Sequence, residues 1–360
     1  MKRRIGILTS GGDCPGLNAA IRGVAKAAYN LFDAEIIGIE NGYQGLIYGH
    51  AQTMEPEDFS NLLTLGGTIL GTSRQPFKSI RKVGEDKFDK VAAMKRNYAG
   101  LKLDCLVVLG GNGTHKTANL LREEGLNVIG LPKTIDNDLF GTDVTFGFHT
   151  AVDIATDVID RIHSTAMSHS RAMVIELMGH KAGWLTLYAG IAGGADIILL
   201  PELPYDIDLV AQAVQGRRTK GRKCSIVAVA EGALSAEEAR MDKKAFKQAR
   251  QAMREPSIAY RIAREIEERT GVESRVVVPG HYQRGGSPSA YDRVLSTRLG
   301  VFAGQLIAEQ HYGVTVAIRG DSLVANPLED VAGKLKTVPA DHELIHAARH
   351  VGVSFGAEKK

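Results

Sequence analysis

The residues best suited to acid–base chemistry lie in the run PKTIDND at 132–138. Its carboxylates Asp136 and Asp138 stand two positions apart, close to the hydroxyl of Thr134. A carboxylate at a strand end can accept the proton of an attacking hydroxyl, and a second one can hold Mg²⁺, which prefers oxygen ligands. A polar turn with Asx-type hydrogen bonds would contain the same residue types. On its own, the run leaves both interpretations open.

Two glycine-rich segments could hold phosphate groups. They are SGGDCPGLN at 10–18 and GGNGT at 110–114, and each stands between a predicted strand and a predicted helix. Backbone N–H groups in such a turn, together with a helix N-terminus, form an anion site, although glycine also serves simple tight turns. Neither segment matches the dinucleotide or P-loop pattern. Two such turns at the carboxyl edge of one sheet favour phosphoryl transfer between two phosphate-bearing substrates.

A fourth motif, HYQRGGSP at 281–288, is cationic. His281 and Arg284 both suit a phosphate, the arginine through paired hydrogen bonds, although an exposed loop would look the same. Further candidates for phosphate binding are Arg74, Arg171, Lys181 and Arg275. Taken singly, each of them would more often be an ordinary solvated charge. The basic run at 217–223 is interpreted as an exposed loop.

Alternating strands and helices must position these motifs. Strands are expected at 4–9, 35–39, 105–109, 127–131, 172–177, 196–200, 225–230, 275–278 and 314–318, with helices at 17–32, 115–124, 183–191 and 298–310. Repeated β-turn-α units are typical of parallel sheets covered by helices on both faces. Trp184 is expected in the core, the charged segment 235–269 as a helical insertion on the surface, and 331–360 as a C-terminal tail.

Composition sets further limits. The 360 residues include 40 Gly and 11 Pro, few aromatics (6%) and a net charge of +3. This charge is too small to indicate a nucleic-acid or membrane partner. Three distant cysteines, Cys14, Cys105 and Cys224, argue against a disulfide framework or a zinc site. Without a long apolar stretch or a signal peptide, we expect a cytoplasmic protein.

The motifs taken together resemble those of the 6-phosphofructokinase family. The resemblance runs from Lys2 to about Arg293 and is carried by GGDCPGLNAAIRG, PKTIDND and HYQRGGSP in the same order. It implies two interleaved three-layer α/β domains with mainly parallel sheets. A phosphoryl-donor domain would comprise 1–140 plus about 288–330, and a sugar-phosphate domain 141–287. The implied reaction moves a phosphoryl group from ATP or pyrophosphate to the 1-hydroxyl of fructose 6-phosphate, a step of glycolysis.

The resemblance also implies roles for individual residues. Asp136 would be the base, while Thr134 and Asp138 would hold the sugar and the transferring group. The donor site would comprise Gly12, Arg74, Gly111, Asn112, Gly113, Thr114 and Lys133. The sugar phosphate would contact Met178, Gly179, His180, Glu231, His281, Tyr282 and Arg284. Arg171 and Arg275 would reach it from a neighbouring subunit, so a homodimer or homotetramer would share active sites.

Two departures from the family pattern affect the chemistry. The glycine turn of the family usually carries an aspartate that binds Mg²⁺, where this chain has Asn112. An amide keeps an oxygen ligand but loses a charge, so the metal would depend more on Asp138 and the donor's phosphates. The family usually has arginine where this chain has His180, which the resemblance places among the catalytic residues. Because histidine is charged only part of the time near neutral pH, it would stabilise the transition state less strongly or in a pH-dependent way.

Donor choice depends on two positions. Pyrophosphate-dependent members carry aspartate at the position of Gly113, where it obstructs a nucleotide, and lysine at the position of Lys133. This chain combines Gly113 with Lys133, the pattern of the mixed-substrate group. Gly113 favours ATP, while Lys133 and the segment 235–269 ally the chain with the pyrophosphate branch. ATP is the expected donor. The alternatives are a pyrophosphate-dependent enzyme, a sugar or NAD kinase with another acceptor, and a non-catalytic paralogue that binds the sugar phosphate.

Overall fold

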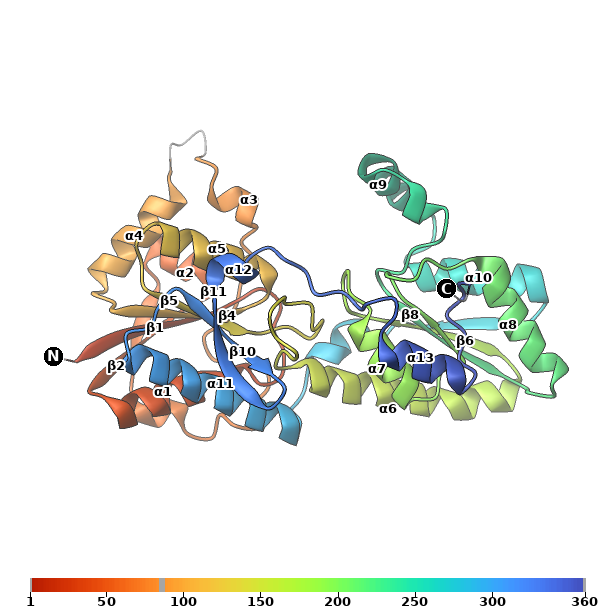
Figure 1. Cartoon of the computed structure of the whole chain (residues 1–360), viewed down its shortest axis with the longest axis horizontal. Coiled ribbons are helices and arrows are strands. Elements are labelled where there is room, and N and C mark those ends of the chain that lie inside the picture. Colours follow the sequence, from red (N-terminus) through yellow and green to blue (C-terminus); the bar gives the residue numbers. More distant parts are fainter. Residues whose placement is uncertain (1, 84–87, 359–360) are drawn as a thin grey trace. The chain divides into compact units, whose positions relative to one another are not determined.

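The computed structural model describes residues 2–83 and 88–358. It divides into two compact units, each with its own sheet. The first unit comprises Met1–Thr150 and Arg284–Lys336, and the second comprises Ala151–Gln283 and Thr337–Lys360. In both units helices cover the two faces of the sheet, so the expected three-layer α/β fold with mainly parallel sheets is confirmed (Figure 1).

The first unit contains a seven-stranded sheet in the order β11-β10-β5-β4-β1-β2-β3. Its strands are β1 (Arg3–Ser10), β2 (Ala34–Ile39), β3 (Ala51–Met54), β4 (Cys105–Gly110), β5 (Val128–Pro132), β10 (Val314–Arg319) and β11 (Ser322–Pro327). Only β3 and β11, at the two edges, pair antiparallel with their neighbours. All six residues of β4 are buried, as expected for a central parallel strand with helices on both faces.

Helices form the two outer layers of this unit. Figure 1 shows α1 (Leu17–Leu31) and α11 (Ala290–Ala308) side by side on one face. The other face carries α2 (Tyr43–Tyr48), α4 (Lys90–Gly100) and α5 (Asn112–Glu123), whose apolar side chains share one core with the sheet. Short helices complete the unit: η1 (Pro56–Phe59), α3 (Phe77–Ile80) and α12 (Leu328–Val331).

The second unit contains a four-stranded, all-parallel sheet in the order β7-β8-β6-β9. Its strands are β6 (Ala172–Leu177), β7 (Ile197–Leu199), β8 (Ser225–Ala230) and β9 (Ser274–Val277). One face packs against α8 (Ile207–Thr219) and α10 (Ile258–Thr270), and the other carries α6 (Phe148–His169), α7 (Trp184–Ala192) and α13 (Glu343–His350) (Figure 1). Trp184, the single tryptophan, is buried as expected.

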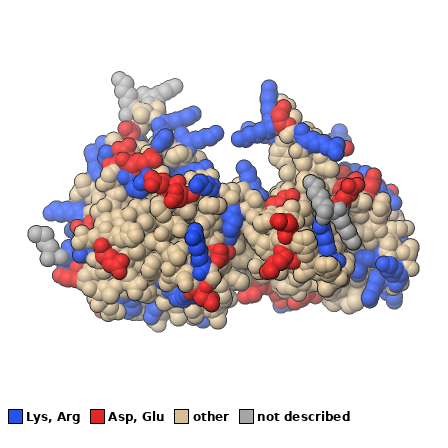
Figure 2. Space-filling model, viewed as in Figure 1, with Lys and Arg blue, Asp and Glu red and all other residues tan. Residues whose placement is uncertain are grey.

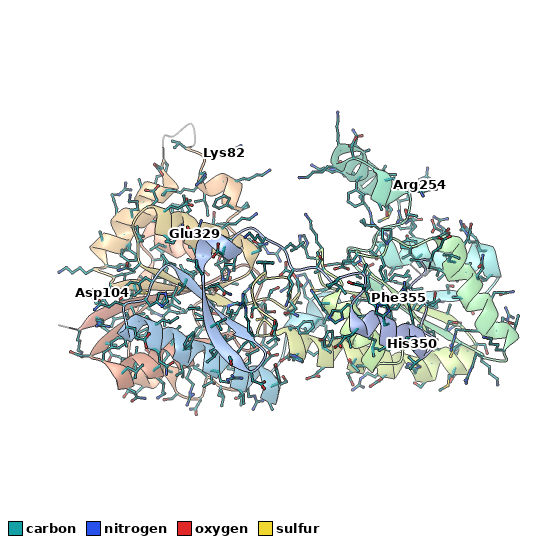
Figure 3. All side chains as sticks on the ribbon, in the orientation of Figure 1. Lys82, Asp104, Arg254, Glu329, His350 and Phe355 are labelled. Atoms are coloured by element: carbon teal, nitrogen blue, oxygen red, sulfur yellow. The ribbon has the colours of Figure 1, made fainter. Side chains whose placement is uncertain are left out.

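The segment 235–269 is not a surface insertion throughout. Ile258, Ile262 and Ile266 of α10 are buried in the core of the second unit, because they form one helical face. Within 235–269, α9 (Lys243–Ala252) is the one helix without a buried residue, and it follows η2 (Glu238–Arg240). Lysine and arginine side chains crowd this helix in Figure 2, and Figure 3 places Arg254 just beyond its end. The basic run at 217–223 also begins inside α8 rather than in a loop.

The C-terminal residues do not form a separate tail. Residues 337–360 belong to the second unit, where α13 packs near α7. Ser354 pairs with Ile197 of β7, and Phe355, labelled in Figure 3, is buried. In the parts of the chain that the structure describes, no helix combines the length and apolar character needed to span a bilayer.

Candidate active site

Three of the motifs meet at the carboxyl edge of the first sheet. β1, β4 and β5 are adjacent and parallel, with Ser10 beside Gly110 and Gly110 beside Pro132. The glycine turns and the PKTIDND loop therefore leave the sheet from three neighbouring strand ends. This is the edge where open α/β sheets bind ligands.

The first glycine turn is held by two cationic side chains. The ammonium group of Lys133 donates a hydrogen bond to the carbonyl of Gly12, and the Arg284 guanidinium donates to the carbonyl of Asp13 over 3.1 Å. A Cβ atom added to Gly12 would lie 2.7 Å from Nη1 of Arg284, so a larger residue there would displace the guanidinium group. Two positive charges beside a glycine turn form a site suited to a phosphate group.

Lys133 is buried, with only 3% of the residue exposed. Burial lowers the pKa of its ammonium group, and repulsion from Arg284 acts in the same direction, while Asp136 and Asp13 oppose the shift. Burial also raises the pKa of the neighbouring Cys14 thiol to about 12, so this cysteine stays protonated and is not a nucleophile.

Arg74 lies beside the same turn. The amide of Gly11 donates to the carbonyl of Ser73 over 3.1 Å, and the hydroxyl of Thr72 donates to the carbonyl of Gly11 over 2.7 Å. These bonds attach the segment before Arg74 to the glycine turn, and the Arg74 side chain is exposed. Its expected place near the donor is compatible with this position.

The PKTIDND loop exposes the expected base and buries its neighbours. Asp136 is half-buried, whereas Thr134, Asn137 and Asp138 are 7% exposed or less. The Thr134 hydroxyl accepts the N–H of Asp136 over 3.0 Å, and the Thr134 carbonyl accepts the Thr145 hydroxyl over 2.7 Å. These bonds fix the backbone that leads into Asp136, which a general base requires because it must be oriented toward its proton donor.

The second glycine motif runs from the last residue of β4, Gly110, through Gly111 into the first turn of α5, so it does not form a separate loop before the helix. The helix begins at Asn112, three residues earlier than expected. The first N–H groups of a helix have no partner within it, so Asn and Gly are tolerated in this turn. A Cβ added to Gly113 would meet nothing within 4 Å. Thr114 is buried, and its carbonyl accepts the hydroxyl of Tyr43 over 2.9 Å.

The side chain of Asn112 is occupied by backbone partners. Its oxygen accepts the N–H of Gly333 over 2.9 Å, and its nitrogen donates to the carbonyl of Lys334 over 2.9 Å. This arrangement does not fit the expected role of Asn112 as a metal ligand. Within residues 2–83 and 88–358, no three His, Cys, Asp or Glu side chains are grouped as a metal site.

His115 also shapes this turn, and no pattern in the sequence distinguishes it from an ordinary helical histidine. It is fully buried, with Nδ1 3.0 Å from the carbonyl of Gly111 and Nε2 2.8 Å from the Thr315 hydroxyl. Burial lowers the pKa of its imidazole to about 4, so the ring is neutral at pH 7. The ring therefore serves to orient the Gly111 carbonyl, not to supply charge.

The sugar candidates gather at the carboxyl edge of the second sheet. Met178, Gly179 and His180 follow β6, and Glu231 follows the adjacent β8. The Glu231 carboxylate accepts the N–H of His180 over 2.7 Å, and His180 has a left-handed backbone with φ 52°. Glu231 thus holds this exposed histidine in an unusual conformation.

The first four residues of the motif HYQRGGSP lie in η3 (Gly280–Arg284), which follows β9. This strand pairs with β6 on the side opposite β8. His281 and Tyr282 are exposed, and the boundary between the two units falls after Gln283. Gln283 is fully buried, accepts the Met178 N–H over 3.3 Å and donates to the Gly280 carbonyl over 3.1 Å. Gln283 thus connects the end of β6 to η3. In the sequence, only its position inside HYQRGGSP could have suggested this role, since a glutamine alone indicates no chemistry.

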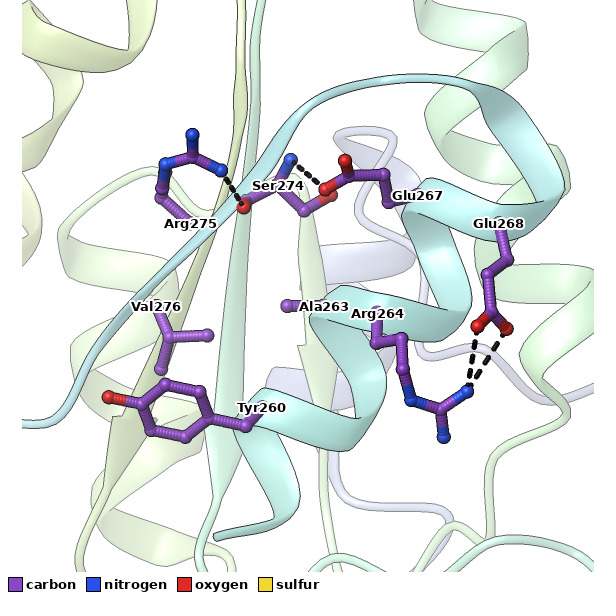
Figure 4. Close-up of a pocket in the computed structure, with 8 residues that line it drawn as sticks. All are labelled: Tyr260, Ala263, Arg264, Glu267, Glu268, Ser274, Arg275 and Val276. Carbon is purple, nitrogen blue, oxygen red and sulfur yellow. Dashed lines mark hydrogen bonds and ion pairs between the residues drawn. The ribbon is translucent and has the colours of Figure 1, made fainter. Parts of the chain in front are cut away.

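Arg171 immediately precedes β6 and Arg275 lies on β9, both away from the strand ends that carry His180 and Glu231. Both form ion pairs with Glu273. Arg275 lines a groove of about 540 Å³ between α10 and β9, together with Tyr260, Arg264 and Val276 (Figure 4). Neither arginine joins His180 and Glu231 within one chain. Lys181 is exposed and follows His180 directly.

Comparison with known proteins connects this arrangement to one family. The family model described as Phosphofructokinase matches residues 4–307. The "ATP-dependent 6-phosphofructokinase" of Spirochaeta thermophila is 61% identical over 98% of this chain and 98% of its own length. The "Pyrophosphate--fructose 6-phosphate 1-phosphotransferase" of Amycolatopsis methanolica is 45% identical over 94% of this chain and 97% of its own.

Solved structures agree with these matches. A phosphofructokinase structure from Saccharomyces cerevisiae superposes with a TM-score of 0.79 at 34% identity, and covers 91% of this chain but 45% of the yeast chain. This chain therefore spans less than half of the yeast protein. Taken with the family match over most of the sequence, these similarities show that the chain belongs to the phosphofructokinase family.

Proposed function

We propose that this protein is an ATP-dependent 6-phosphofructokinase, which transfers the γ-phosphoryl group of ATP to the 1-hydroxyl of fructose 6-phosphate. The observation that carries the activity is the 61% identity, over nearly the whole length of both chains, to a relative named for it. The choice of ATP is supported by Gly113, because this position carries no side chain that could obstruct a nucleotide, and a Cβ atom added there would meet nothing within 4 Å.

In the proposed reaction, Asp136 takes the proton of the sugar 1-hydroxyl as that oxygen attacks the γ-phosphorus. The new O–P bond forms while the bond to the β-phosphate oxygen breaks, which gives fructose 1,6-bisphosphate and ADP. Lys133 and the N-terminus of α5 would balance the negative charge of the donor's phosphates, and the bond from Lys133 to the first glycine turn supports this role. Phosphoryl transfer depends mainly on such positioning and neutralisation.

The sugar would be bound by Met178, Gly179, His180 and Glu231, and its 6-phosphate by His281 and Arg284. Arg171 and Arg275 would serve the sugar phosphate of a neighbouring subunit. Their separation from His180 along β6 and β9, and the open groove beside Arg275, support a role toward a second chain (Figure 4). The active form would then be a homodimer or homotetramer.

Mg²⁺ would accompany ATP rather than occupy a cage of protein ligands. The amide of Asn112 is already bonded to Gly333 and Lys334, and Mg²⁺ commonly binds through substrate phosphates, waters and one or two carboxylates. Asp138 is the carboxylate that we assign to this role. All three cysteines are free thiols, which supports a cytoplasmic location for this glycolytic activity.

A pyrophosphate-dependent enzyme is the second candidate. Lys133 supports it, as does the Amycolatopsis methanolica relative named for that reaction at 45% identity. The deciding test is an initial-rate assay with fructose 6-phosphate and Mg²⁺, in which ATP and pyrophosphate are offered separately. Turnover with ATP alone supports the proposal. Turnover with pyrophosphate alone would favour the pyrophosphate-dependent enzyme instead. The absence of turnover with either donor would favour a non-catalytic sugar-phosphate-binding protein.

A further inference from the structure

A short segment of the first unit, residues 333–336, runs along the PKTIDND loop, and we call it the strap. Leu335 pairs antiparallel with Leu139, and the Lys336 N–H donates to the carbonyl of Asp138 over 2.8 Å. At its other end the strap is held by the side chain of Asn112. The strap therefore links the first turn of α5 to the loop that carries the proposed base.

Lys336 directs its side chain into this loop. Its ammonium group donates to Oδ1 of Asn137 over 3.0 Å and to the carbonyls of Thr142 and Asp143, each over 2.9 Å. An ammonium group offers three donors, so these three acceptors use all of them. Such charge-assisted bonds are stronger than neutral ones.

Asn137 is the residue that these bonds hold in place. It stands between Asp136 and Asp138, and its backbone has the left-handed φ of 51°. Its Oδ1 atom also accepts the N–H of Thr145 over 3.1 Å. A non-glycine residue persists in this conformation only when its surroundings enforce it. Without Lys336 the loop would lose an anchor at the position between the two carboxylates.

We propose that Lys336 is a positioning residue for phosphoryl transfer, which fixes the backbone of Asn137 and thereby aims Asp136 and Asp138. This inference rests on the proposed function. Lys336 lies outside residues 4–307, the part that the family model matches, and no motif includes it. Lys336 is not among the residues proposed to bind the substrates, and its bonds to Asn137 and to the Asp138 carbonyl mean that its influence would pass through the loop.

The test compares Lys336→Met and Lys336→Arg with the control Lys334→Met in the full-length protein. Lys334 lies in the same strap, but its side chain is exposed and lies over the ring of Phe140. For Lys336→Met we expect kcat to fall at least about tenfold while KM for ATP stays within about twofold. Lys336→Arg should recover part of the activity, because a guanidinium group also donates several hydrogen bonds to the loop. Lys334→Met should resemble wild type.

Hydrogen exchange separates failure of this inference from failure of the proposed function. The Asp136 and Thr145 amides, both bonded within the loop, should exchange faster in Lys336→Met than in Lys334→Met, whether or not the protein turns over fructose 6-phosphate. Equal exchange in the two variants, or equal kcat values, would overturn the positioning role. A wild-type protein that is inactive with every donor would overturn the proposed function instead, and the exchange result would still decide the role of Lys336.

Discussion

At the scale of single residues, the carboxylate of Asp136 carries the proposed proton transfer. It is the half-buried member of a loop whose other polar side chains are buried, and Thr134 fixes its backbone. Asp136→Asn should lower kcat by about 100-fold or more, because an amide cannot accept the proton, while KM for fructose 6-phosphate stays nearly constant. Steady-state kinetics at pH 7 check this, and a kcat close to wild type would show that another group is the base.

Gly113 offers an unusually direct test of donor choice. Because no atom lies within 4 Å of a Cβ atom placed at this position, Gly113→Asp should fold normally and leave the melting temperature nearly unchanged. The added carboxylate should repel the phosphates of ATP and raise KM for ATP by about tenfold or more. ATP kinetics that do not change would remove Gly113 from the argument. The control is the same substitution at Gly100, at the end of α4, where an added Cβ atom also meets nothing within 4 Å. Gly125, after α5, is equally open, but its positive φ makes it a poorer control.

At the scale of elements, the strands can be predicted well from the sequence. β6 and β8 have the bounds that the sequence predicts, because each is an apolar run closed by polar or glycine residues. The start of α5 is hidden because Asn112 and Gly113 resemble a turn, and α11 begins eight residues before its expected position, where Ser289 caps it. The amide partners of Asn112 could not be predicted, since they come from 221 and 222 positions along the chain.

Within the second unit, a buried ion network connects the exposed helix α9 to α10. Glu238 is 5% exposed, and its carboxylate accepts hydrogen bonds from Arg250 of α9 and Arg261 of α10. Burial acts to raise the pKa of Glu238, but the bonds from Arg261 and the Ser235 amide outweigh it, so the pKa is lowered. The network therefore stabilises the fold above the ordinary glutamate pKa of 4.5, and that contribution is lost as the pH falls through the lower folded value.

Glu238→Gln should destabilise the second unit by about 3 kcal/mol at pH 7, because it leaves two arginines without their carboxylate. Urea unfolding followed by the fluorescence of Trp184, which lies in this unit, reports the change. Glu255→Gln is the matched control, since Glu255 pairs with the half-exposed Arg264 and should cost about 1 kcal/mol or less. The difference between wild type and Glu238→Gln should shrink below pH 4.5. Equal losses in the two variants would show that the network carries no special stability.

At the scale of the whole molecule, the chain passes between its two units three times, after Thr150, Gln283 and Lys336. The family resemblance implies interleaved domains, but periodicity alone cannot show which helices join which sheet. The last passage explains why residues 331–360 resemble a tail in the sequence. These residues show only weak alternation of charged and apolar residues, because the strap belongs to the first unit and α13 to the second. Each part is ordered by residues far away in the sequence.

The proposed sharing of active sites leads to a mixing experiment. If Asp136 of one chain and Arg275 of its neighbour serve the same sugar phosphate, Asp136→Asn and Arg275→Ala homo-oligomers should each be nearly inactive. A mixed dimer would contain one site with both changes and one intact site. Random reassembly of equal amounts should therefore restore about one quarter of the wild-type activity, since half of the dimers are mixed and each has one working site of two. Activity that stays at the level of the separate variants after subunit exchange would show that each chain supplies its own Arg275, and the interface between chains would then have no part in catalysis.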